Sequence, residues 1–145
     1  MGRRAQGMAA KRVILPVLAA TAVTLAVFAL WLRAQAPALV AIVDVTVPAE
    51  FNDDQAAGAA LFAQNCATCH GENGAGVEHT GPPLVHIIYE PSHHPDGAFY
   101  AAVQLGVRAH HWDYGDMPRQ PDLSEGQIAR IIAYIRALQR ENGIH

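Results

Sequence analysis

The 145-residue sequence is poor in residues on which several classes of protein depend. Two cysteines are too few for a disulfide framework or for a zinc site built mainly from thiolates. Lysine occurs once, at Lys11, and the positions after residue 36 carry five arginines against thirteen acids, which leaves a net charge of −8. This acidic balance excludes the basic face that nucleic-acid binding requires.

The two cysteines stand three positions apart, in Cys66-Ala67-Thr68-Cys69-His70. This C-x-x-C-H pattern is the attachment signature of a c-type haem. Thiols at i and i+3 lie on one side of a helical turn, where each can add to a haem vinyl group, and His70 follows as the proximal iron ligand. A zinc site would need further ligands, and a thioredoxin-like pair would need a βαβ context; a structural disulfide is the remaining alternative. The motif predicts one covalent haem c held by Cys66, Cys69 and His70.

Residues 13–32 contain no charged side chain over twenty positions, a length that matches the hydrocarbon core of a bilayer. Four basic residues precede this stretch and one follows it, which predicts a cytoplasmic basic tail at 1–12 and a transmembrane anchor at 13–33. A cleaved signal peptide is the alternative, because Ala34-Gln35-Ala36 resembles a cleavage site. The long apolar run and Pro37 favour the anchor. With either interpretation, we expect a haem domain in the periplasm, and the anchor makes it a single-pass protein of the cytoplasmic (inner) membrane.

Residues 34–50 are expected to form a stalk between the membrane and a haem-bearing domain at 51–145. The alternating apolar pattern of Ile42–Val47 predicts an extended segment within this stalk. The alternative is that Val43, Val45 and Val47 pack against the following domain.

Helices are predicted at the beginning, middle and end of residues 51–145. The first is capped by Asn52, Asp53 or Asp54 and runs into the haem motif. Gly58 lies within it, and close approach of another helix would explain a glycine there. The second begins at Pro95-Asp96 and ends at Gly106.

The last helix has the clearest sequence signal. It begins with the capping box Ser124-Glu125-Gly126-Gln127 and ends at Asn142-Gly143. Apolar residues recur along it at helical spacing; they are Ile128, Ile131, Ile132, Ile135 and Leu138. The predicted fold class is therefore all-α: three to four helices around a covalent haem, preceded by an N-terminal transmembrane helix.

Two further positions are candidates for holding the iron. The carbonyl of Pro82, in a stiff Gly-Pro-Pro turn, is a candidate acceptor for the second ring nitrogen of His70. Met117 is the one methionine outside the first eight residues, and a thioether in the sixth position suits electron transfer. His110 and His111, in the same long loop as Met117, are the alternative sixth ligands.

Five of the eight histidines fall within 26 residues; they are His86, His93, His94, His110 and His111. One interpretation is a second metal site, for example for copper, beside the haem. The other is a set of loop histidines that are exposed to solvent or hydrogen-bonded to the haem propionates.

From about Phe51 to Asn142 the chain resembles a class I cytochrome c. The residues that carry this resemblance are Cys66-x-x-Cys69-His70, Thr80–Leu84, Gly115-Asp116-Met117-Pro118 and Tyr134 in the last helix. The resemblance implies an all-α fold, covalent haem, His70/Met117 ligation, and first and last helices that cross at Gly58, Phe62 and Tyr134. The whole chain is similar to membrane-anchored monohaem cytochromes of bacteria, but the histidine-rich stretch is not part of the general family pattern.

Electron transfer without an enzymatic activity is the function that these patterns favour. The expected partners are membrane or periplasmic redox proteins with basic docking patches, because the domain is acidic. No small-molecule substrate is expected. The alternatives are a haem-based ligand-binding or enzymatic component with a labile sixth ligand, and a copper-handling cytochrome that uses the histidines between His86 and His111.

Overall fold

A computed structural model describes residues 21–31 and 40–145, which belong to separate compact units, residues 1–38 and 39–145. Residues 21–31 form a helix with exposed apolar side chains such as Phe28 and Trp31. Within the two described ranges, no helix is both long and apolar enough to cross a bilayer. The ends of the predicted anchor, 13–20 and 32–33, lie outside the described residues, as does the tail at 1–12.

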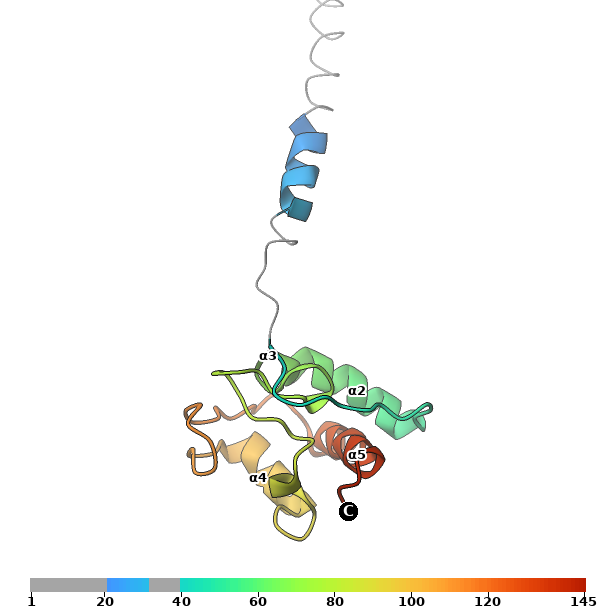
Figure 1. Cartoon of the computed structure of the whole chain (residues 1–145), viewed down its shortest axis with the longest axis vertical. Coiled ribbons are helices and arrows are strands. Elements are labelled where there is room, and N and C mark those ends of the chain that lie inside the picture. Colours follow the sequence, from blue (N-terminus) through green and yellow to red (C-terminus); the bar gives the residue numbers. More distant parts are fainter. Residues whose placement is uncertain (1–20, 32–39) are drawn as a thin grey trace, which may run out of the picture. The chain divides into compact units, whose positions relative to one another are not determined.

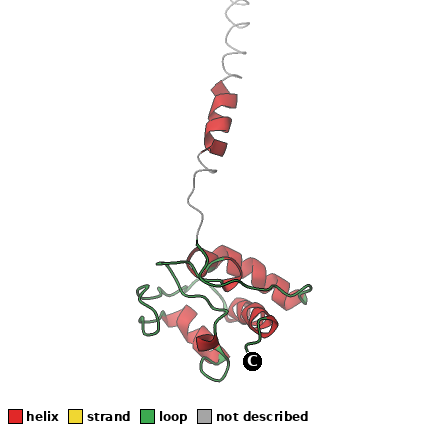
Figure 2. Ribbon diagram, viewed as in Figure 1, coloured by secondary structure: helices red, strands yellow, loops and turns green. Residues whose placement is uncertain are grey.

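The unit from residue 39 onward is helical, and the all-α fold class is confirmed for it. Three helices of ten or more residues dominate (Figure 1): α2 (Asp53–Asn65), α4 (Asp96–Leu105) and α5 (Glu125–Glu141). Figure 2 draws the remainder as loops with short helical turns. The turns are α3 (Ala67–His70), η1 (Glu72–Gly74) and η2 (Ile87–Tyr89). Between residues 40 and 145, extended pairing is limited to two isolated bridges, Val77 with Gly81 and Val107 with Met117.

Capping side chains fix where two of the long helices begin. The Asn52 side chain accepts a hydrogen bond from the backbone N–H of Gln55, and the Gln55 side chain accepts one from the backbone N–H of Asn52. Ser124 and Gln127 form the same reciprocal pair at the start of α5. Each pair satisfies backbone N–H groups that have no partner within the helix, so the predicted starts of both helices are correct.

Helices α2 and α5 cross at Gly58, where their backbones come unusually close. A Cβ atom at Gly58 would lie 2.0 Å from the backbone oxygen of Arg130 and 3.0 Å from the Cβ of Tyr134. Beside the crossing, the rings of Phe62 and Tyr134 lie 5.6 Å apart. The close approach of a second helix is therefore the reason for glycine at this position, as the sequence suggested.

The apolar stripe of α5 forms the centre of the core. Ile128 and Leu138 are fully buried, and Ile131, Ile132 and Ile135 are nearly so. One part of the stripe packs with Phe62 of α2, and another part packs with Val103 of α4. The last helix thus joins the other two long helices into one domain.

Residues 40–46 lie against the same domain. The backbone N–H groups of Ile42 and Val43 donate to the carbonyl of Ala75, and Thr46 exchanges two hydrogen bonds with the side chain of Asn142. Val45 packs against the core, whereas Val47 is exposed. The sequence left open whether the valines of this segment pack onto the domain, and the structure shows that Val45 does.

A buried arginine fixes the loop that precedes α4. Arg136 of α5 donates to the backbone oxygens of Tyr89 and His94 and pairs with Asp96 at 2.8 Å. Its guanidinium also lies 4.8 Å from the ring centre of Phe99. This network attaches residues 89–96 to the core helix, although no sequence pattern pointed to it.

Candidate haem-attachment site

An apolar cavity of about 400 Å³ opens between α2, α4, α5 and the loop of residues 107–117. Its volume is in the range of ligand and cofactor pockets. Most of its wall is aliphatic or aromatic, and α5 contributes four isoleucines. Four of the predicted site residues line it: Cys66, His70, Pro82 and Met117. Cys69 is exposed beside them.

The C-x-x-C-H motif folds as one helical turn directly after α2. The N–H groups of Cys69 and His70 both donate to the carbonyl of Cys66, at 3.1 and 2.9 Å. A turn of this kind places side chains three positions apart on the same side, so both thiols can reach one planar group. Burial raises the pKa of the Cys66 thiol to about 11, and Cys69 acts in the same direction.

His70 is oriented by the proline turn. Its Nδ1 atom lies 2.9 Å from the carbonyl oxygen of Pro82. Burial lowers the pKa of His70 below its ordinary value, while the hydrogen bond to Pro82 acts the other way. Burial favours the neutral imidazole, and the hydrogen bond to Pro82 places its proton on Nδ1, so Nε2 is the nitrogen that is available to a metal. The turn itself is pressed against the motif, because a Cβ at Gly81 would lie 2.5 Å from the backbone oxygen of Cys69.

Met117 is positioned by a backbone bridge. Its N–H donates to the carbonyl of Val107 at 2.8 Å, and its own carbonyl accepts from the Val107 N–H at 3.0 Å. The neighbouring Asp116 side chain accepts from the N–H of Ala109 at 2.9 Å. The long loop is therefore pinned across its base, with the half-buried Met117 side chain on the cavity wall.

The structure separates the five clustered histidines into two sets. The ring of His86 packs against Trp112, with 5.3 Å between the ring centres. His93, His94, His110 and His111 lie together, with ring centres of neighbouring pairs 4.3 to 6.3 Å apart. Desolvation lowers the pKa of His111, and the positive charges that its three neighbours acquire act in the same direction. His94, His110 and His111 also border the cavity.

Trp112 provides a test of whether these residues fit a haem. Its Nε1–H is buried on the cavity wall and makes no hydrogen bond of ordinary geometry with the described residues, although Trp112 partly offsets the burial that raises the pKa of the Tyr89 hydroxyl. A buried donor without a partner costs free energy, and a haem propionate is an acceptor that could satisfy it. No pattern in the sequence indicates this buried N–H. The thiols, the oriented imidazole, the apolar wall and this donor all fit a haem.

The fold and the site together define a c-type haem domain: a shell of helices and one long loop around a cavity bordered by a C-x-x-C-H motif and a methionine. The family model described as "Cytochrome c" matches residues 55–139, more than half of the chain, and the chain belongs to this family. It is also similar to a cbb3-type cytochrome c oxidase subunit CcoP of Rhodobacter capsulatus, with 30% identity over 84 residues. The match covers 57% of this chain and 28% of that relative. No solved structure matches the chain at a significant level.

Proposed function

We propose that this chain is an electron-transfer cytochrome with a single haem c, attached through Cys66 and Cys69 and ligated by His70 and Met117. The observation that carries the proposal is that Cys66, His70 and Met117 line one apolar cavity. The bound haem would supply the one-electron chemistry of its iron. No acidic or arginine side chain is among the residues that line the cavity, and an electron-transfer protein needs none there.

The residues of the chain would act mainly by holding their positions. The hydrogen bond to Pro82 keeps the His70 ring in one orientation, and the Val107 bridge holds Met117. The isoleucines of α5 give the cavity an apolar wall against which a haem face would pack. Such a preorganised, apolar shell requires little rearrangement when the charge at its centre changes, which favours fast electron transfer.

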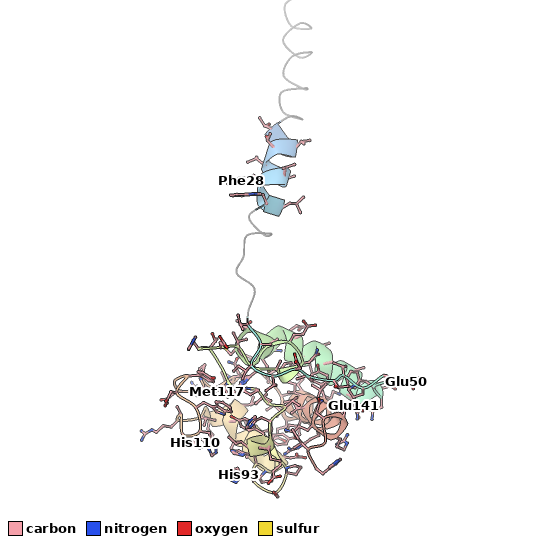
Figure 3. All side chains as sticks on the ribbon, in the orientation of Figure 1. Phe28, Glu50, His93, His110, Met117 and Glu141 are labelled. Atoms are coloured by element: carbon pink, nitrogen blue, oxygen red, sulfur yellow. The ribbon has the colours of Figure 1, made fainter. Side chains whose placement is uncertain are left out.

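Met117 is the sixth ligand in this proposal, rather than His110 or His111. All three line the cavity, but both histidines are solvent-exposed while Met117 is half buried. The ring of His110 is also held toward its own loop, with Nδ1 2.8 Å from the carbonyl oxygen of Arg108. Figure 3 shows His110 near the outer edge of the domain and Met117 further in.

Absorption spectra of the purified full chain test the proposal. We expect haem that stays with the protein in acid–acetone, a six-coordinate low-spin spectrum in both oxidation states, and the weak sulfur-to-iron band of the oxidised form. Replacing both attachment residues, Cys66→Ser with Cys69→Ser, should remove the bound haem. Haem that is fully extracted from the native protein would overturn the proposal.

Carbon monoxide distinguishes electron transfer from the main alternative. A ligand-binding or enzymatic haem protein has a labile sixth position and should bind carbon monoxide readily in the reduced form. A Met117-ligated electron carrier should show little change over the same time. Rapid, stoichiometric binding would favour the alternative function while leaving the attachment site intact.

A membrane attachment through residues 13–33, with the haem domain in the periplasm, completes the proposal. It is supported by the uncharged run in the sequence. The partners would be membrane or periplasmic redox proteins with basic docking patches, and a cbb3-type oxidase is one candidate because of the relative's name. If the proposal holds, the chain should stay in the membrane fraction after alkaline carbonate washing and be released by deleting residues 1–36.

A further inference from the structure

Three histidines that the haem does not require converge at one point of the domain surface. His93 and His94 come from the loop before α4, and His111 comes from the long loop that leads to Met117. One ring nitrogen from each lies within 4.8 Å of the other two. Metal–nitrogen bonds of about 2.1 Å would place such nitrogens about 3.4 Å apart in a tetrahedral site. Small side-chain rotations would therefore bring all three onto one ion.

His94 is already oriented as a metal ligand would be. Its Nδ1 atom lies 2.7 Å from the backbone oxygen of Ile88. A ligating histidine usually donates its other ring N–H to such an acceptor, which fixes the tautomer and leaves Nε2 for the metal. Arg136 in addition donates to the backbone carbonyl of His94, so both the ring and the backbone of this residue are fixed by the core.

Nearby acids do not account for the clustering of these rings. Glu90 accepts a hydrogen bond from the Ser92 hydroxyl at 2.6 Å, and Asp96 pairs with Arg136. The described part of the chain has its one group of possible metal-binding side chains here, and the group consists of histidines alone. Imidazoles brought together without a carboxylate repel one another when protonated, and a shared cation removes that cost.

We propose that His93, His94 and His111 form a site for a divalent transition-metal ion, bound in addition to the haem, with Cu(II) the ion held most tightly. Imidazole ligands suit copper, zinc and nickel, and the general order of affinities places Cu(II) first. His110 lies next to the site, with its ring centre 4.3 Å from that of His111. It is outside the ligand set. Figure 3 shows His93 and His110 on the same side of the domain.

A copper titration of the untagged, oxidised full chain with its haem tests this site. Ferric protein is used so that the haem does not reduce the added ion. Isothermal titration should give one tightly bound Cu(II) per chain, with an electron paramagnetic resonance spectrum typical of nitrogen ligands. His93→Ala and His111→Ala should each weaken binding about tenfold or more, and Zn(II) should compete at higher concentration.

Two exposed histidines outside the cluster provide matched controls. His79→Ala and His145→Ala remove the same chemical group and should leave the copper affinity unchanged. The haem absorption spectrum should be unaffected in the His93, His79 and His145 variants, because none of these residues lines the haem cavity. Equal affinity of the native protein and the His93 variant would overturn the site. Loss of the six-coordinate, low-spin haem spectrum in the His111 variant would also overturn it, because His111 would then be an iron ligand.

Discussion

Met117 is the residue whose substitution tests the iron ligation most directly. Met117→His should keep a six-coordinate haem, because the Val107 bridge holds the backbone of residue 117 whatever its side chain. The reduction potential should fall by on the order of 0.1 V, since axial ligands set potentials over a range of about 0.8 V. Redox titration followed by absorbance measures the change. Met8→Leu is the control, and a potential unaltered by Met117→His would contradict the ligation.

Arg136 is a second residue with a measurable role, in stability rather than in ligation. Arg136→Leu would leave the partly buried carbonyl of His94 without its donor and that of Tyr89 with Gln139 alone, and we expect the free energy of unfolding to fall by about 3 kcal/mol. Arg130→Leu removes an exposed ion pair with Asp54 and should change the free energy of unfolding by less than about 1 kcal/mol. Denaturant unfolding of the haem-loaded variants measures both. Equal decreases in the free energy of unfolding for the two variants would mean that the Arg136 network stabilises the fold no more than an exposed ion pair does.

The crossing of α2 and α5 can be tested with two glycines that lie in helices. At Gly58 a methyl group would meet the backbone of Arg130, so Gly58→Ala should lower the free energy of unfolding by about 3 kcal/mol. Gly126, in the first turn of α5, has no atom from outside its own stretch of helix within 4 Å of its Cβ position. Gly126→Ala should therefore raise stability, by up to about 1 kcal/mol. Thermal unfolding should separate the two variants, and a neutral Gly58→Ala would mean that the helices can move apart.

At the scale of elements, the sequence predicted what is encoded locally. The caps at Asn52 and Ser124 and the stop at Gly106 depend on neighbouring residues, so α2, α4 and α5 were found close to their observed bounds. The turns η1 and η2, of three residues each, were not predicted. Runs that short carry too few residues for a periodic pattern to be recognised.

In the candidate site too, the sequence predicted local motifs but not contacts between distant residues. The C-x-x-C-H motif is contiguous, so its cysteines and histidine could be identified directly. The bridge between Val107 and Met117 joins residues ten positions apart, and Arg136 reaches a loop more than forty positions earlier. Such contacts depend on tertiary packing. Sequence alone therefore could not separate His86 from the other clustered histidines, nor show the buried N–H of Trp112.

The whole domain carries a charge that should govern how it meets its partners. Residues 40–145 hold five arginines, thirteen acids and no lysine, a net charge of −8. Long-range attraction to a basic partner is screened over about 10 Å at 0.1 M salt. Stopped-flow reduction by a basic cytochrome should therefore slow about tenfold or more between 10 and roughly 300 mM salt. Reduction by an uncharged small-molecule donor is the control and should change little. If the rate of reduction by the basic cytochrome did not depend on salt, electrostatic docking would be ruled out. Added salt in this range acts on the encounter by screening the attraction between charges.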